Sequence, residues 1–300
     1  MSAAAGAQRI VQALQQLGAR CVFGLPGTQN VALFEALRTS QLRLVVATNE
    51  LSAAMMANGY YRASGRPGVL LTIPGPGFTW ALTGLAEAAL DSAAILHVTN
   101  APARGPGHRF QLQAIDQAAM AAPLARRVVN VESAGEIAAK IAEAWHECRA
   151  GEPGPVLVQV SREVWKQDST DAVNLTVPTD ASPSLPPDAA AVAQALKQAR
   201  RRVLLLGQGC NDAANEATRL AEHLSAAVVT TTSGRGVVPE DHPLSLGYAL
   251  AANDADGLNA LIDASDLVLA IGCKFSHNGS RGFRLNIPAQ KLIHVDASGE

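Results

Sequence analysis

The fold of this chain is indicated most clearly by residues 45–62, whose sequence is VVATNELSAAMMANGYYR. An apolar run ends at Ala47, Asn49 is a residue type that caps helices, and Glu50 opens a segment of small, helix-compatible residues. The loop FGLPG lies upstream at residues 23–27, and Gly75-Pro76-Gly77 lies downstream. Each of the three segments follows a short apolar run, which is the pattern of consecutive βα units.

The first half of the chain alternates between short apolar runs and segments with helical spacing. Strands are expected at 21–24, 42–47, 68–73, 94–98 and 155–160, and helices at 7–17, 30–38, from 50 onward, 79–90 and 134–148. Most of these strands are continuously apolar, which indicates burial on both faces. The sequence therefore predicts an α/β fold in which helices cover a parallel sheet.

The composition changes at residues 166–187, where Asp, Ser, Thr and Pro dominate, and we expect a linker there. A second βα series follows, with strands expected at 203–207, 227–231, 267–271 and 292–295 and helices at 213–224 and 257–264. We therefore predict two consecutive parallel-sheet domains, at residues 1–165 and 188–300, with helices on both faces. No helix is expected after the last strand, so the second sheet is expected to be incomplete.

Composition limits the classes of function. The formal net charge is −2 over 300 residues, which argues against a nucleic-acid-binding surface. The first residues lack the pattern of a signal peptide, and no apolar run is long enough to cross a bilayer. The cysteines lack metal-ligand spacing and indicate buried thiols in a reducing compartment. They are Cys21, Cys148, Cys210 and Cys273. We expect a cytoplasmic protein that binds neither nucleic acid nor membrane.

The chemistry is expected at one edge of the first sheet, because open α/β sheets bind ligands at the carboxyl ends of their strands. Residues 25–30, 48–50 and 74–78 should converge there. Their neighbouring glycines would let a flat ligand approach the backbone; these are Gly24, Gly27, Gly75 and Gly77. Each feature also has a structural interpretation: Glu50 suits the helix dipole, Gly59 suits close helix packing, and Gly-Pro-Gly suits a tight turn.

Taken together, these motifs resemble thiamine diphosphate-dependent enzymes of the acetolactate synthase and benzoylformate decarboxylase type. The resemblance spans nearly the whole chain: residues 1–165 are similar to the pyrimidine-binding domain and 188–300 to the middle domain. The most family-like string is TTTSGRGVVPEDHPLSLG at 230–247, supported by VLAIGCKF at 268–275 and IHVD at 293–296.

The resemblance implies a decarboxylase or carboligase that acts on a 2-oxo acid as a homodimer or homotetramer, with each site shared between subunits. Glu50 matches the glutamate that hydrogen-bonds the aminopyrimidine ring and helps the cofactor lose its thiazolium C2 proton. The resemblance further implies the following site residues. Cofactor-binding positions are Pro26, Gly27, Glu50, Gly75, Pro76 and Gly77, and substrate-pocket positions are Trp80, His108, Phe110 and Gln111.

Some positions depart from the family pattern, and these departures concern which substrate is bound rather than the cofactor. Trp80 replaces an expected amide, Ile73 and Pro74 replace small hydroxyl residues, and Leu112 replaces a common acid. His97 and His108 are candidate proton carriers, of which His108 is preferred because a histidine within a strand is more often structural.

The middle domain raises the question of FAD. Gly207-Gln208-Gly209 follows a strand but lacks the third glycine of a dinucleotide fingerprint, so a tight turn is the alternative. Ser276-His277-Asn278 replaces an acidic pair of the flavin-dependent relatives. FAD is therefore possible but disfavoured.

The family's third domain, which holds Mg²⁺ and the diphosphate through a Gly-Asp-Gly motif, has no counterpart in residues 1–300. We expect it on a second polypeptide or in a longer form of this chain, so the isolated chain should bind the cofactor weakly and be inactive. The alternative function is a non-catalytic nucleotide-binding or regulatory module that retains the fold.

Overall fold

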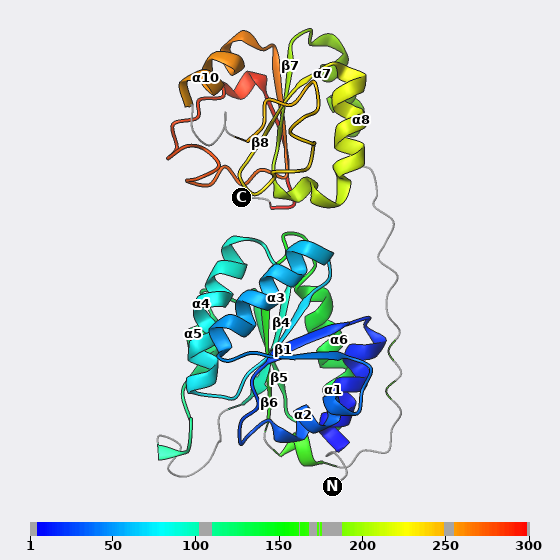
Figure 1. Ribbon diagram of the computed structural model, residues 1–300, viewed down its shortest axis with the longest axis vertical. Helices are drawn as coiled ribbons and strands as arrows, with labels where there is room; N and C mark the ends of the chain where they lie inside the picture. The colour runs from blue at the N-terminus through cyan, green and yellow to red at the C-terminus, as the bar shows by residue number, and fades with distance from the viewer. Residues whose placement is uncertain are drawn as a thin grey trace. The chain divides into compact units, whose positions relative to one another are not determined.

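The computed structural model describes residues 5–101, 110–161, 163–167, 173, 175, 188–248 and 255–298. The chain divides into two compact units, Met1–Asp180 and Ala181–Glu300, each with its own sheet (Figure 1). Both sheets are parallel throughout, and helices pack on them, so the predicted α/β class and its two parallel-sheet domains are confirmed.

The sheet of the first unit has six strands in the order β2-β1-β3-β4-β6-β5. They are β1 (Cys21–Gly24), β2 (Arg43–Val46), β3 (Gly68–Leu71), β4 (Ile95–Asn100), β5 (Arg127–Val131) and β6 (Pro155–Val160). Strands β3, β4 and β6 are buried along their whole length, whereas the edge strand β2 is partly exposed. The continuously apolar strands are thus the inner ones, as the pattern predicts.

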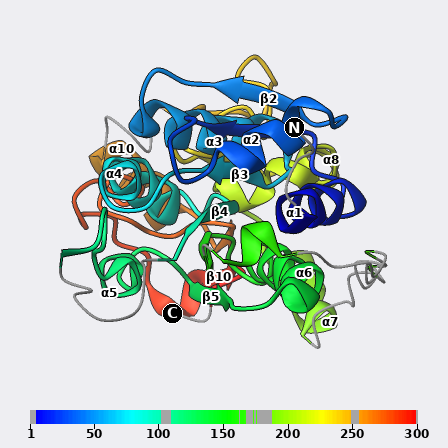
Figure 2. The ribbon, with the colours of Figure 1, turned by 90° about the horizontal axis from the view of Figure 1, so that it is seen from below.

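Helices cover both faces of this sheet (Figures 1 and 2). Helices α1 (Ala5–Gln16), α2 (Val31–Arg38) and α6 (Ile137–Glu147) share one hydrophobic cluster with one face. Helices α3 (Glu50–Ser64), α4 (Pro76–Leu90) and α5 (Gln117–Ala121) pack on the opposite face. The short turns η2 (Ala134–Glu136) and η3 (Val164–Lys166) complete the unit.

The two ends of the first unit touch each other. Helix α1 packs against α6 and η3. A side chain at Gly6 would collide with the backbone of Val164. Gln16 hydrogen-bonds the backbone of Val173 and Leu175, and Val173 is buried in the same core. The described part of the expected linker therefore packs on the first unit.

The second unit has four strands in the order β10-β9-β7-β8. They are β7 (Arg202–Leu206), β8 (Ala227–Thr230), β9 (Leu267–Ile271) and β10 (Leu292–Val295), with helices α7 (Ala189–Gln198), α8 (Ala214–Leu224), α10 (Ala255–Ala264) and turns η4 (Gln208–Ala213) and η5 (Ala289–Lys291). A Cβ atom on Gly209 would lie 2.7 Å from the Cα of Gly272, and one on Gly207 would collide still more closely with the carbonyl oxygen of Gly272. These glycines let backbone segments meet at the strand ends, as the tight-turn interpretation requires.

The structure differs from the sequence-based expectation at four elements. Helices α5 and α7 and strand β5 are present where none was expected. Helix α4 begins at Pro76 rather than at residue 79, because Gly75 adopts φ 67° as the N-cap and Pro76 fits the first helical turn. The expected Gly-Pro-Gly loop is therefore largely the start of a helix. None of the described helices is both long and apolar enough to cross a membrane.

Gly59 does not mediate helix packing, contrary to the structural interpretation of its position. It is exposed in the middle of α3, and no described atom lies within 4 Å of the position that a Cβ would occupy. The close contact between α3 and α4 is made by Gly84, where a Cβ would lie 2.5 Å from the Cβ of Ala54.

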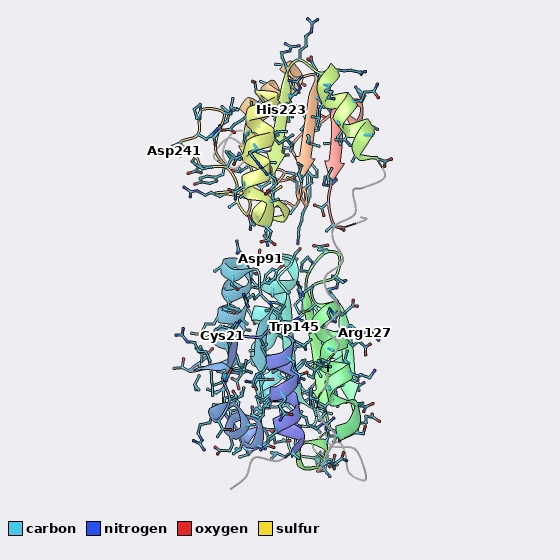
Figure 3. All side chains as sticks on the ribbon, turned by 90° about the vertical axis from the view of Figure 1, so that its right-hand side faces the viewer. Cys21, Asp91, Arg127, Trp145, His223 and Asp241 are labelled. Carbon is cyan, nitrogen blue, oxygen red and sulfur yellow. The ribbon has the colours of Figure 1, made fainter. Side chains whose placement is uncertain are left out.

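Gly59→Ala should stabilise the first unit by about 0.5–1 kcal/mol, because alanine is the better helix former and fits without collision. Urea denaturation followed by tryptophan fluorescence measures this, since the tryptophans Trp80, Trp145 and Trp165 all lie in that unit (Trp145 is labelled in Figure 3). Gly84→Ala is the matched control and should be destabilising. Equal destabilisation by both variants would show that the space beside Gly59 is filled.

Candidate functional site

Glu50 stands at the first position of α3, at the carboxyl edge of the sheet. The Oδ1 atom of Asn49 accepts a hydrogen bond of 2.7 Å from the Ser52 amide, which fixes the start of the helix at Glu50. Glu50 is only 8% exposed. No hydrogen bond or ion pair joins its carboxylate to another described residue, so this buried carboxyl is available for a ligand.

The three predicted loops are linked through Ile73, and one of them borders the Glu50 carboxyl. A Cβ atom on Gly77 would lie 2.8 Å from the Oε1 of Glu50 and 2.5 Å from Cγ1 of Ile73. A Cβ on Gly27 would lie 2.5 Å from Cγ2 of the same Ile73. The isoleucine side chain therefore lies between the two glycines, and the expected convergence of the loops holds. Both glycines are required here because any side chain would displace Ile73 or Glu50.

The loop at residues 25–30 is shaped by Asn30, which is 1% exposed. Its Oδ1 accepts a 2.8 Å hydrogen bond from the Gly27 amide, and its Nδ2 donates a 3.1 Å bond to the Leu25 carbonyl. These two bonds order the backbone around Gly27. Pro26 is exposed at the same loop.

Gly24 and Gly75, the other two glycines near these loops, leave space that other protein atoms occupy. A Cβ on Gly24 would lie 2.5 Å from the Leu71 carbonyl oxygen, so Gly24 allows two strands to pair closely. A Cβ on Gly75 would lie 2.7 Å from the Cβ of Gln113. The Gly75 amide donates a 3.1 Å hydrogen bond to Oε1 of Gln117.

The predicted substrate-pocket residues lie on the surface. Trp80 is 60% exposed on α4 and Phe110 is 86% exposed, and Gln111 and Pro76 are exposed as well. His108 lies outside the described residues. The structure thus brings together Gly27, Glu50 and Gly77 but does not enclose the pocket residues.

His97 is a structural residue. It is 1% exposed, its Nε2 lies 2.9 Å from Oγ1 of Thr72, and its ring stacks on Phe78. Burial lowers its pKa from 6.5 to about 3, so the ring is neutral at physiological pH. Its burial and these contacts agree with the structural interpretation of a histidine near a strand end.

Sequence reasoning missed the side chains that support the three loops. Ile73 was noted only as a departure from a family pattern, and Gln29, Gln113 and Gln117 were not singled out. Gln29 Nε2 donates a 2.6 Å hydrogen bond to Gln113 Oε1, which joins two loops far apart in sequence. The described residues include no group of three His, Cys, Asp or Glu side chains suited to a metal ion.

Comparison with known proteins agrees with this arrangement. Residues 4–120 match the family model described as the N-terminal TPP binding domain of thiamine pyrophosphate enzymes, and residues 189–300 match the central domain. A probable acetolactate synthase large subunit of Methanocaldococcus jannaschii is 31% identical over 97% of this chain and 51% of that protein.

Two further relatives match this chain over similar lengths. The acetolactate synthase isozyme 1 large subunit of Escherichia coli is 30% identical over 97% of this chain and 52% of its own length. A probable 2-ketoarginine decarboxylase of Pseudomonas aeruginosa is 32% identical over 96% of this chain and 52% of its own length. The chain spans about half the length of the curated relatives that it matches.

Proposed function

Because this chain belongs to the thiamine pyrophosphate enzyme family, of which it contains the N-terminal and central domains, we propose that it holds and activates the pyrimidine end of thiamine diphosphate. The complete enzyme is then a decarboxylase or carboligase that acts on a 2-oxo acid. The observation that supports this most directly is Glu50, a carboxyl that is 8% exposed and borders Gly77, where a Cβ would lie 2.8 Å from its Oε1.

The residues present fit an aminopyrimidine ring. A flat, polar heterocycle needs a hydrogen-bonding side chain at its edge and a close approach to the backbone. Glu50 offers the first, and the bare backbone at Gly27 and Gly77 offers the second. Pro26, Gly75 and Pro76 complete the expected contact set. When bound, thiamine diphosphate supplies the carbanion chemistry that lets a 2-oxo acid lose CO₂.

Within this arrangement the Glu50 carboxyl holds or releases one proton at the edge of the bound aminopyrimidine ring. Its carboxyl has no competing partner among the described residues, so its hydrogen bond is available to a ring nitrogen. Glu50 is itself only 8% exposed, and a water-poor site strengthens such a hydrogen bond. The missing side chain at Gly77 keeps the carboxyl from being pushed aside.

We further propose that the site is shared between subunits, that Mg²⁺ is bound with the diphosphate, and that the protein is cytoplasmic. Exposed apolar side chains on α3 and α4 support association with another subunit, since large exposed apolar patches mark interaction surfaces; they are Met55 (40% exposed), Met56 (44%) and Trp80 (60%). The diphosphate and its Mg²⁺ are then held by the family's third domain. All four cysteines are free thiols, which supports a reducing, cytoplasmic location.

Titration of the ¹⁵N-labelled chain with thiamine diphosphate and Mg²⁺ tests the proposal. The amide signals of Gly27, Gly75 and Gly77 should shift, even at weak affinity, and Glu50→Gln should reduce the shifts. A parallel titration with ADP tests the alternative function. Shifts confined to the second unit with ADP, and none near Glu50 with thiamine diphosphate, would favour a nucleotide-binding module instead.

Truncating the proposed pocket residues should change substrate preference without costing stability. Trp80 and Gln111 are exposed, so Trp80→Ala and Gln111→Ala should alter the free energy of unfolding by no more than about 0.5 kcal/mol. In the complete enzyme, the ratio of kcat/KM between two 2-oxo acids should change about tenfold or more.

The matched control is Trp145→Ala. Trp145 is 4% exposed, so its truncation should cost roughly 3–5 kcal/mol of stability. If Trp80→Ala and Gln111→Ala keep the wild-type substrate ranking, the substrate binds elsewhere.

A further inference from the structure

The buried side chain of Gln117 makes three hydrogen bonds close to the site. It is the first residue of α5 and is 0% exposed. Its Oε1 accepts the 3.1 Å hydrogen bond from the Gly75 amide. Its Nε2 donates to the main-chain oxygen of Asn100 at 3.0 Å and to Oε1 of Gln159 at 2.9 Å. One amide group therefore ties the start of α4 to the ends of β4 and β6.

The hydrogen bond to Gly75 is connected to Glu50 through the first turn of α4. Gly75 is the N-cap of α4, with φ at 67°, so its amide position sets where the helix begins. Gly77 lies in the first turn of that helix and borders Oε1 of Glu50, where a Cβ would be only 2.8 Å away. A change in the Gly75 amide therefore changes the space beside the carboxyl.

A second contact acts on the same glycine. Gln113 adopts φ 63°, an uncommon value for a residue with a side chain, and its backbone borders Gly75. Its side chain accepts the hydrogen bond from Gln29, in the loop that contains Gly27. Segment 113–117 thus touches both glycine loops of the site.

We propose that Gln117 is a positioning residue that sets the location of Gly77 beside the Glu50 carboxyl. This inference rests on the proposed function, because positioning matters only if a ligand uses Glu50. Gln117 itself does not touch the ring. It acts through the Gly75 amide and the first turn of α4.

If Gln117 only stabilised the fold, its substitution would have the same effects as substitution of a buried neighbour. Gln159 is that neighbour. Gln159 is 5% exposed, accepts from Gln117 and donates a 3.1 Å hydrogen bond to Asn130. It belongs to the same buried network but makes no bond to Gly75. Gln159→Met should therefore weaken the fold as Gln117→Met does, without disturbing Glu50.

The experiment compares Gln117→Met, Gln159→Met and wild type in the 300-residue chain without cofactor. The readouts are the ¹³C shift of the Glu50 carboxyl, identified by its loss in Glu50→Gln, and the amide shift of Gly77. Both should move in Gln117→Met and stay at wild-type values in Gln159→Met. Gln117→Asn keeps the amide but is one methylene shorter, so it should also move both signals, and it serves as the test if Gln117→Met fails to fold.

In the complete enzyme, Gln117→Met should lower kcat by up to about 10²-fold and leave KM for the 2-oxo acid unchanged, because a small misplacement affects the chemical step. Equal shifts in Gln117→Met and Gln159→Met, or shifts in neither, would overturn the inference. Failure of the proposed function is seen separately, as an absence of thiamine diphosphate binding by the wild-type chain.

Discussion

Glu50→Gln is expected to leave the first unit folded and to slow exchange of the cofactor's C2 proton by about 10²–10⁴-fold in the complete enzyme. Glutamine has the same shape but cannot hold or release a proton as the carboxyl does. The fold should tolerate the change because the Glu50 carboxylate has no hydrogen-bond partner among the described residues. Loss of its interaction with the dipole of α3 should cost no more than about 1 kcal/mol.

The exchange rate is measured by hydrogen–deuterium exchange at the thiazolium C2, followed by NMR. Glu87→Gln is the control, since Glu87 is an exposed carboxylate on the neighbouring helix α4 and should leave the rate unchanged. If Glu50→Gln exchanges at the wild-type rate, the activating group must be another residue.

His97 should make the first unit sensitive to acid. Its pKa in the folded state is lowered by burial to about 3, against 6.5 in the unfolded chain. Between these values the unfolded state binds the additional proton, so stability rises with pH and is lost as pH falls below about 6.5. At pH 4.5 this single group should cost roughly 2–3 kcal/mol, since each pKa unit corresponds to about 1.4 kcal/mol.

His97→Gln should remove this dependence, because a glutamine does not titrate and can still reach the Thr72 hydroxyl. Urea denaturation between pH 4.5 and 7.5, followed by tryptophan fluorescence, reports the first unit alone. His223→Gln is the control, since His223 is exposed on α8 of the second unit (Figure 3) and should not change the slope. An unchanged slope in His97→Gln would mean that the ring is protonated in the folded state.

The strands could be predicted from the sequence because buried strands are continuously apolar. All five strands expected in the first unit are present, including β6 (Pro155–Val160) at its predicted bounds. Strand β5 was missed because Arg127 and Asn130 interrupt its apolar run, as suits an edge strand that is partly exposed. Helix α5 is only five residues long, too short for helical periodicity to be recognised.

The site was predictable only in part. Glu50 and its glycine loops follow from local order along the chain, since each loop follows its own strand. Gln117 could not be found in this way, because its partners Gly75 and Gln159 are both 42 positions away. Ile73 has no local signal either: its role depends on two glycines that come together only in the folded sheet.

The contact between α1 and residues 164–166 also has a consequence for synthesis on the ribosome. The apolar stripe of α1, which includes Ile10 and Leu14, is complete as soon as residue 16 is translated. It packs on α2, which is translated soon afterwards, and on α6 and η3, which come from the far end of the unit. At translation rates of about 5–20 residues per second, the part of the stripe that packs on α6 and η3 waits roughly 8–30 s for them. The nascent chain therefore presents a binding site for chaperones during most of the synthesis of this unit, and slower elongation would lengthen that exposure.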